Sequence, residues 1–194
     1  MWLTEHCREY PKSFEHLIDT LIPSKTRLKL LLKFFLNSKT TAYLRGLECE
    51  FGESTNAIRL ELNRFEEAGL LESHTEGNKK IYQANTKHPI FPDIQNILKK
   101  YIGIDQIIEK VITRLGDINK VYVIGDFANG KNSPVIELII IAQQLNRNYL
   151  TELIEKTESL IKRKISYIIL NETELADYKQ KHAGNRLVIY TKDK

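Results

Sequence analysis

The chain has 194 residues, of which 42% are hydrophobic and 28% charged, and its net charge is +4. This composition excludes a disordered or fibrous protein, and the length suits two compact units that bury their cores without disulfides or metals. No apolar run reaches the roughly 18 residues of a membrane-spanning helix, and the opening residues lack the apolar core of a secretory signal. We therefore expect a cytoplasmic protein with no membrane partner.

Cysteine and histidine are too sparse and scattered to indicate a metal site. Cys7 and Cys49 lie far apart, and neither belongs to a CxxC pattern. The five histidines form no HxxxH or HExxH pair. We interpret both cysteines as structural thiols and predict no metal and no bound cofactor. The mildly basic charge permits contact with nucleic acid but does not demonstrate it.

Residues 1–22 are expected to be an extension that precedes the first domain. Its segment SFEHLIDTLI places Phe14, Leu17, Ile18 and Leu21 at helical spacing, which predicts a short helix. Residues 1–12 carry no clear pattern. The short helix could add to an interface between subunits.

Three helices are predicted next. The first follows Ser24, a typical N-cap residue, and has apolar residues at helical spacing. The second covers TTAYLRGLECEFG and stops at Gly52. The third begins after Ser54 in ESTNAIRLELNRFEEAGLL. Basic residues of the first helix are predicted to lie on the surface, namely Lys25, Arg27, Lys29 and Lys33.

The third helix has an apolar face and an opposite face of amide and guanidinium groups. Ile58, Leu62 and Phe65 fall on the first face, whereas Asn56, Arg59 and Asn63 fall on the second. Asparagine can bond adenine and arginine can bond guanine, so the polar face suits a DNA major groove. The alternative is a helix face that is merely solvated. Leu60, near this face, could meet a thymine methyl group or another subunit.

The segment LLESHTEGNKKIYQA predicts a hairpin with a Gly77-Asn78 turn. Three helices followed by a basic hairpin constitute a winged helix, which we assign to residues 23–88 and in which the third helix enters the groove. The predicted base contacts are Thr55, Asn56, Arg59 and Asn63. The predicted phosphate contacts are Lys25, Arg27, Tyr43, Arg64, His74, Asn78, Lys79 and Lys80.

This part of the chain resembles the winged helix-turn-helix domain of the ArsR-like bacterial transcriptional regulators. The resemblance covers residues 23–88 and is carried by TRLKLLLKFFLN, by FGESTNAIRLELNRFEEAGLL and by GNKKIYQAN. The chain resembles especially a branch of these regulators in which the winged helix precedes a nucleotidyltransferase-like domain. The resemblance implies a homodimer on pseudo-palindromic double-stranded DNA. The metal-sensing members carry a paired-cysteine box, where this chain offers only Cys49.

A helical connector is predicted over residues 89–116. Pro89 and Pro92 mark the end of the winged helix. Apolar residues then recur at helical spacing in two groups, which predicts two helices. Such stripes are more typical of core or of a dimer contact than of a ligand pocket. The first group is Ile94, Ile97, Leu98 and Tyr101, and the second is Ile107, Ile108, Val111 and Leu115.

Residues 117–194 are predicted to form a small α/β domain of about four strands, which makes the whole chain an α+β protein. The segment VYVIGDFANG...VIELIII resembles the signature of the nucleotidyltransferase fold. In that signature Gly-Ser leads a helix and approaches a triphosphate, and Asp-x-Asp follows on the next strand. The two carboxylates point to one face of the strand and hold a pair of Mg²⁺ ions.

The signature has lost most of its chemistry here. Gly125 matches, but Asp126 stands where the hydroxyl belongs, and Asp-x-Asp becomes Val135-Ile136-Glu137. The strand ISYIILN supplies no further carboxylate. We therefore predict no catalytic residue and a domain that is not an enzyme. Asp126 would also place a negative charge beside a polyphosphate.

The same turn could still admit a nucleotide or a sugar nucleotide as an effector. The candidate effector pocket consists of Gly125, Asp126, Gly130 and Glu137. The alternative is that Asp126 caps the short helix or pairs with Lys131, that Glu137 pairs with a lysine, and that the glycines only permit a tight turn.

The leading hypothesis is a dimeric DNA-binding transcriptional regulator whose second domain serves dimerisation, effector sensing or both. The alternative is an active nucleotidyltransferase whose winged helix recruits a substrate. A third hypothesis is an antitoxin-like regulator whose second domain docks a protein partner. The operator, the regulated genes and the effector do not follow from the sequence.

Overall fold

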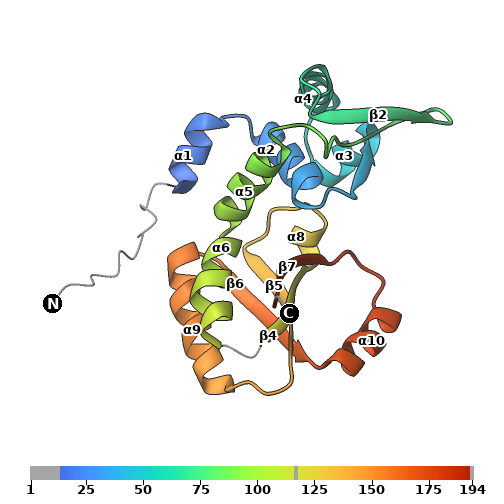
Figure 1. Cartoon of the computed structure of the whole chain (residues 1–194). Helices are drawn as coiled ribbons and strands as arrows, with labels where there is room; N and C mark the ends of the chain where they lie inside the picture. Colours follow the sequence, from blue (N-terminus) through green and yellow to red (C-terminus); the bar gives the residue numbers. More distant parts are fainter. Residues whose placement is uncertain (1–13, 116–117, 193–194) are drawn as a thin grey trace.

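The first half of the chain carries helices that pack around a three-stranded sheet (Figure 1). The computed structural model describes residues 14–115 and 118–192; residues 1–12 lie outside this range. The strand order is β1-β3-β2, and both pairs are antiparallel. The elements are α1 (Phe14–Leu21), α2 (Lys25–Leu31), the π-helical turn η1 (Leu32–Leu36), β1 (Thr41–Tyr43), α3 (Leu44–Phe51), α4 (Thr55–Glu67), β2 (Leu71–Glu76) and β3 (Lys79–Ala84).

The predicted helices are confirmed, with one correction. Ser24 caps α2 by accepting a hydrogen bond from the Arg27 backbone N–H, and Gly52 ends α3 with a φ of 63°. The second helix, however, begins at Leu44, because Thr41–Tyr43 is extended and pairs with β3. The pairing satisfies backbone groups that a longer helix would have satisfied internally. The sequence pattern does not reveal this partner, which lies about forty residues further along the chain.

The run from Leu30 to Leu36 is buried along its whole length, including the charged Lys33. The prediction that Lys33 lies on the surface is therefore wrong. A helix that is buried on all sides has neighbours on all sides. Here one side contacts the winged helix, and the other contacts α5 and α8 of the following segments.

The connector is helical, as predicted. It consists of α5 (Phe91–Ile102), α6 (Ile104–Ile107), the π-helical turn η2 (Ile108–Ile112) and α7 (Thr113–Leu115). Gly103, with a φ of 87°, separates α5 from α6. Leu98, Ile107 and Val111 are buried within the chain, whereas Ile97 is 43% exposed. The stripe of the second helix is therefore core, and part of the first faces outward.

The second half is a four-stranded mixed sheet with helices on both faces (Figure 1). The strand order is β6-β5-β4-β7, in which only β5 and β6 are parallel. The four predicted strands are confirmed. The elements are β4 (Ile118–Ile124), α8 (Gly125–Ala128), β5 (Val135–Ala142), α9 (Arg147–Ile161), β6 (Lys164–Leu170), α10 (Glu172–Lys181) and β7 (Leu187–Thr191).

Alternate residues of the central strands face opposite helices, as the period of a strand requires. Val123 and Leu138 belong to the core cluster that includes residues of α6 and α9. Tyr122 and Ile139 belong to a smaller cluster with Leu175 of α10. Both faces of this sheet are therefore covered, which explains why β5 reads as a continuous apolar run.

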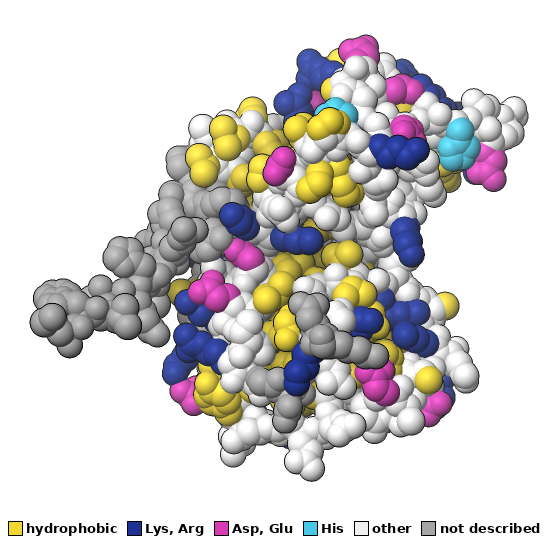
Figure 2. All heavy atoms as spheres, in the orientation of Figure 1, with side chains coloured by type: hydrophobic (Ala, Val, Ile, Leu, Met, Phe, Trp, Pro, Cys, Tyr) yellow, Lys and Arg dark blue, Asp and Glu magenta, His cyan; other side chains and the backbone are white. Residues whose placement is uncertain are grey.

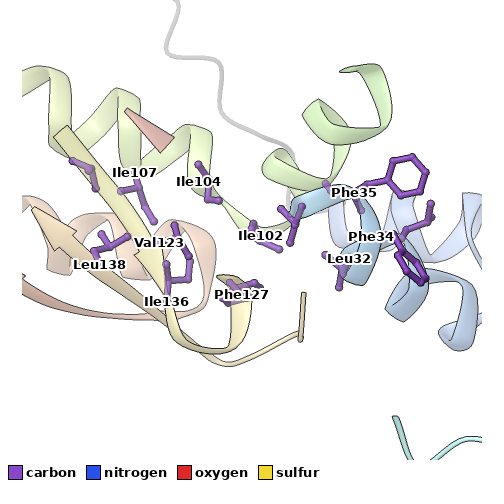
Figure 3. Close-up of a cluster of buried hydrophobic side chains, with 14 of the residues drawn as sticks. Leu32, Phe34, Phe35, Ile102, Ile104, Ile107, Val123, Phe127, Ile136 and Leu138 are labelled. Atoms are coloured by element: carbon purple, nitrogen blue, oxygen red, sulfur yellow. The ribbon is translucent and has the colours of Figure 1, made fainter. Parts of the chain in front are cut away.

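One core cluster extends from the winged helix to the second sheet (Figure 3). Leu32 and Phe35 of η1, Ile102 of α5, Phe127 of α8 and Ile136 of β5 all belong to it. The division into domains at residues 88 and 116 stays a prediction. The buried side chains nevertheless continue across both of these positions.

Candidate nucleic-acid interface

Helix α4 lies at the outer end of the molecule (Figure 1). Its polar face is exposed to solvent. Ile58, Leu62 and Phe65 are buried in the core, which fixes the rotation of the helix about its axis. Asn56, Arg59 and Asn63 are exposed on the opposite side, and Thr55 is half-buried. The structure thus brings the four predicted base contacts onto the first two and a half turns of one helix. Figure 2 shows Lys and Arg side chains at this end, interspersed with Asp and Glu.

The exposed face of α4 is engaged only weakly within the chain. Among the described residues, the Arg59 side chain makes one hydrogen bond, from Nη1 to Asn56 Oδ1 at 3.5 Å. That distance is at the limit of a hydrogen bond. Leu60 is 52% exposed beside this face. The guanidinium and amide groups are therefore available to a partner from outside.

A lysine closes the turn between α3 and α4. Lys29 Nζ donates to the backbone oxygen of Phe51 at 2.9 Å and pairs with Glu53 at 2.7 Å. The hydrogen bond from Lys29 holds the pKa of Glu53 below its ordinary value. These contacts fix the angle at which α4 leaves the turn. The sequence does not indicate them, because Lys29 lies more than twenty residues before its partners.

Two of the predicted phosphate contacts share a buried carboxylate. Glu61 of α4 is 5% exposed, and Arg27 of α2 donates to it through Nε at 2.7 Å and Nη2 at 3.3 Å. Arg64 Nη1 donates to the same carboxylate at 3.2 Å. A bidentate arginine pair of this kind fixes direction as well as distance. Arg27 therefore holds α2 against α4, and Arg64 remains 52% exposed at its side chain.

The β2–β3 hairpin projects beside α4 as a wing (Figure 1). Its turn has a positive φ of 57° at Gly77 only, as expected of a two-residue hairpin turn with glycine in the first central position. His74 and Asn78 are exposed near the tip. Lys79 Nζ lies 4.4 Å from the ring centroid of Tyr43, which joins the wing to β1 by a cation–π contact.

Glu66 of α4 anchors the base of the wing. Its carboxylate accepts hydrogen bonds from Lys80 Nζ at 2.6 Å and from Ser73 Oγ at 2.5 Å. The bond from Lys80 lowers the pKa of Glu66, and the same bond raises the pKa of Lys80. Lys80, a predicted phosphate contact, is thus paired within the chain. Lys25 is exposed at the start of α2.

The second half contains an open hollow of about 240 Å³ beside the start of α8. Gly125 and Glu137, two residues of the candidate effector pocket, line it together. Gly125 has a φ of 65°, which favours glycine, and a methyl group there would also displace the Glu137 carboxylate. The remaining lining comes from the end of β4, the residue after α8, α10 and the loop between α10 and β7: Ile124, Asn129, Tyr178, His182, Ala183, Gly184, Asn185 and Arg186.

Asp126 and Gly130 do not line this hollow. Asp126 is exposed, and its backbone oxygen accepts a hydrogen bond from the backbone N–H of Lys131 at 2.9 Å. Within the part of the chain that the structure describes, no ion pair joins these two side chains, and none joins Glu137 to a lysine. Gly130 is buried against the backbone of Lys33 instead.

Two further observations concern residues 14–115 and 118–192. Within these ranges no three or more His, Cys, Asp and Glu side chains are arranged to hold a metal ion. Within the same ranges no helix combines the length and the apolar character needed to cross a membrane.

No protein-family model matches the chain, and no curated protein sequence matches it. Three solved structures are similar to about half of it. Reduced HlyU from Vibrio cholerae N16961 is 12% identical with a TM-score of 0.33, over 50% of this chain and 87% of HlyU. AF1382 from Archaeoglobus fulgidus is 22% identical with a TM-score of 0.35, over 47% of this chain and 96% of AF1382. The transcriptional regulator BldR from Sulfolobus solfataricus is 15% identical with a TM-score of 0.36, over 52% of this chain and 72% of BldR.

Proposed function

We propose that the chain is a DNA-binding transcriptional regulator in which α4 enters the major groove and the wing contacts the adjacent backbone. The observation that carries this proposal is the solvent-facing side of α4, where Asn56, Arg59 and Asn63 have no strong partner within the described chain. Asparagine and arginine are the side chains that bond adenine and guanine edges bidentately. The buried side of α4 holds these groups in a fixed direction.

The phosphate contacts in this proposal come from both sides of α4. Lys25, His74, Asn78 and Lys79 are exposed, and they supply charge or hydrogen-bond donors without reading bases. Arg64 keeps free N–H donors, because its described bond to Glu61 uses one nitrogen. Contacts of this kind make DNA affinity fall with salt.

We further propose that the protein binds as a homodimer through α1 and α5. These helices pack on one another, and Leu17, Leu21, Ile90 and Ile97 leave between 43% and 66% of their surface exposed there. Apolar side chains that gather in this way favour an interface. Sedimentation velocity tests the interface: Ile97→Glu should give monomers, whereas Leu160→Glu, on the exposed face of α9, should leave the dimer intact. A dimeric Ile97→Glu variant would contradict this interface.

The second half is proposed to be a nucleotidyltransferase-like domain without catalysis that senses an effector, a nucleotide or a sugar nucleotide, in the hollow beside Gly125. Asp126 occupies the position of the signature hydroxyl, and Val135 that of the first signature carboxylate. Glu137 is thus the single signature carboxylate that remains, and two-metal chemistry needs more ligands than one. The alternative, an active nucleotidyltransferase, is tested by incubation with Mg²⁺ or Mn²⁺ and labelled nucleoside triphosphates. Transfer that Glu137→Ala abolishes would overturn the proposal.

Fluorescence anisotropy with a duplex from the chain's own upstream region tests DNA binding. Arg59→Ala should weaken binding about 5- to 150-fold, the value of one bidentate base contact. Arg147→Ala, which removes an exposed arginine at the start of α9, is the matched control and should bind like the wild type. Lys79→Ala should reduce the slope of log affinity against log salt concentration by about one, because one phosphate contact is lost. Wild-type affinity in Arg59→Ala, together with binding that ignores salt, would refute the groove contact.

A further inference from the structure

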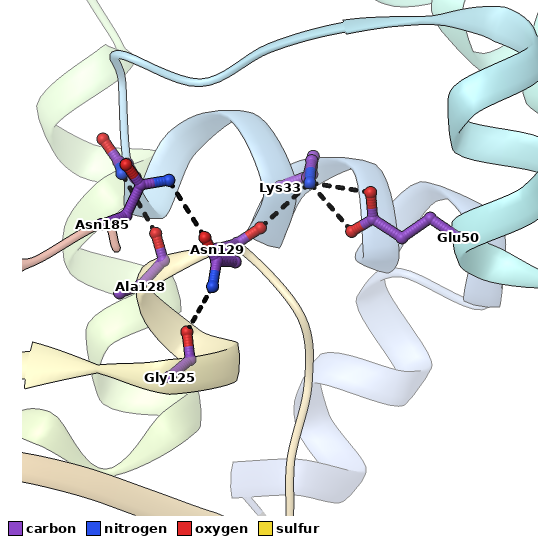
Figure 4. Close-up of polar contacts among 7 residues, drawn as sticks. Lys33, Glu50, Gly125, Ala128, Asn129 and Asn185 are labelled. Carbon is purple, nitrogen blue, oxygen red and sulfur yellow. Dashed lines mark hydrogen bonds and ion pairs between the residues drawn. The ribbon is translucent and has the colours of Figure 1, made fainter. Parts of the chain in front are cut away.

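A buried lysine connects the helix-turn-helix to the second half of the chain (Figure 4). Lys33 Nζ lies 2.8 Å from both carboxylate oxygens of Glu50, on α3. It also donates to the backbone oxygen of Asn129, just after α8, at 3.1 Å. The side chains of Lys33 and Glu50 are 11% and 17% exposed. A charged pair with so little exposure needs all of its hydrogen-bond partners, because each unsatisfied charged group would lower the stability of the fold.

The end of α8 packs closely against the same turn of helix. Asn37 Nδ2 donates to the backbone oxygen of Ala128 at 3.0 Å. A methyl group at Gly130 would collide with the Lys33 backbone and would lie 2.9 Å from the Leu32 backbone oxygen. Residues 128–130 therefore touch the first-half helix through two hydrogen bonds and one backbone-to-backbone contact. A displacement of residues 128–130 would therefore move the helix as well, because closely packed backbones are nearly incompressible.

Asn129 extends this junction to the hollow beside Gly125. Its side-chain Nδ2 donates to the Gly125 backbone oxygen at 2.8 Å, and its Oδ1 accepts from Asn185 Nδ2 at 3.0 Å. Asn129 and Asn185 both line the hollow. The backbone oxygen of the same asparagine holds Lys33. Asn129 thus lines the hollow and also binds Lys33, the residue that holds Glu50 of α3.

We propose that residues 128–130 are a joint through which the second half of the chain sets the position of α3, and thereby the DNA affinity of α4, with Lys33 as the positioning residue. The inference rests on the proposed DNA binding. Its physical basis is that Glu50 of α3 is held by Lys33, Lys33 is held by Asn129, and α3 packs directly on α4. Lys33 is buried at 9% exposure, so it acts on DNA through α3 and not by contact.

The first experiment compares Lys33→Met with Lys33→Met/Glu50→Met in full-length protein. The single variant leaves a half-buried carboxylate without its partner, whereas the double variant replaces the pair by apolar groups of similar length, a change that is often neutral for stability. Both should weaken binding to the upstream duplex by about two- to thirtyfold, the range for coupling through a packed network. Lys156→Met, on the exposed face of α9, is the matched control and should bind normally.

The salt dependence of binding separates positioning from contact. A lysine that touches phosphate lowers the slope by about one when it is removed. Because Lys33 is buried, its variants should lose affinity with an unchanged slope. Wild-type affinity in a folded double variant would overturn the proposal, and so would a slope reduced by one.

Hydrogen exchange reports on the joint without any DNA. In Lys33→Met/Glu50→Met and in Gly130→Ala, peptides from α3 and α4 should exchange faster than in the wild type. Ser159→Ala, on the exposed face of α9 and outside the lining of the hollow, is the control for the second variant and should leave exchange in α3 and α4 unchanged. Faster exchange in a protein that binds no DNA would refute the proposed function and retain the joint. Unchanged exchange in α3 and α4 would refute the joint itself.

Discussion

Replacing Phe127 by alanine tests whether the two halves of the chain fold as one cooperative unit. Phe127 is 1% exposed and belongs to the cluster that contains Leu32 of the winged helix and Ile136 of the second sheet. The guanidinium group of Arg163 also lies 5.4 Å from the centroid of its ring. Loss of a buried phenylalanine ring costs about 3–5 kcal/mol, the sum of lost burial and of the cavity that remains. With a urea m-value of about 2–3 kcal/mol/M, the unfolding midpoint should fall by roughly 1.5 M.

The assay is urea unfolding followed by circular dichroism, with pulsed hydrogen exchange on peptides from α4 and from β5. We expect one transition, and in Phe127→Ala both peptides should lose protection at the same lowered urea concentration. Tyr149→Ala removes an aromatic side chain that is 39% exposed, and it should shift the midpoint very little. If the α4 peptide keeps its wild-type midpoint while the β5 peptide shifts, the halves fold independently and the inference from the continuous core is wrong.

Three further predictions concern single contacts. Glu61→Ala leaves two arginines without their shared carboxylate and should lower the unfolding free energy by about 1–3 kcal/mol in denaturant titrations; unchanged stability would show that the pair contributes nothing. Lys80 lowers the pKa of Glu66, so the stabilisation of the wing by this ion pair is complete above the ordinary pKa of 4.5 and is lost as the pH falls through the lowered pKa. The free energy of hydrogen-exchange protection in the wing should fall over this pH range by no more than about 1 kcal/mol. Glu66→Gln should remove this pH dependence, and a dependence that persists would point to another group. Gly103→Ala should lower the melting temperature more than Gly52→Ala, because both have positive φ but only the first methyl group would lie 2.8 Å from a side chain of α9; equal effects would contradict the packing.

Local patterns predicted most elements and the rotation of α4. Ser54 and the spacing of Ile58, Leu62 and Phe65 place its start and its buried side, because capping and amphipathic period depend on neighbours along one helix. The strand Thr41–Tyr43 does not follow from its local pattern, because it is stabilised by pairing with β3, which comes after α3, α4 and β2 in the chain. Short segments follow their tertiary partners more than their own propensity.

The exposed residues of the candidate site follow from the sequence, whereas the contacts of its residues with the rest of the chain do not. Asn56, Arg59 and Asn63 are exposed as the helical period requires. Arg27, by contrast, looked like a free surface cation and is bound to Glu61. Gly130 looked like part of a pocket and packs against Lys33. Sequence lists the charges that are present but not the partners that neutralise them.

The sequence by itself therefore determined most of the helices and strands in their order, and the apolar and polar faces of α4. Each of these depends on residue type and on spacing within one segment. Only the tertiary structure decided that Lys33 is buried, that Glu61 joins two arginines and that Asn129 touches both halves of the chain. Lys33 and Asn129 are separated by 96 residues, and no local pattern encodes a hydrogen bond between segments that lie so far apart in the sequence.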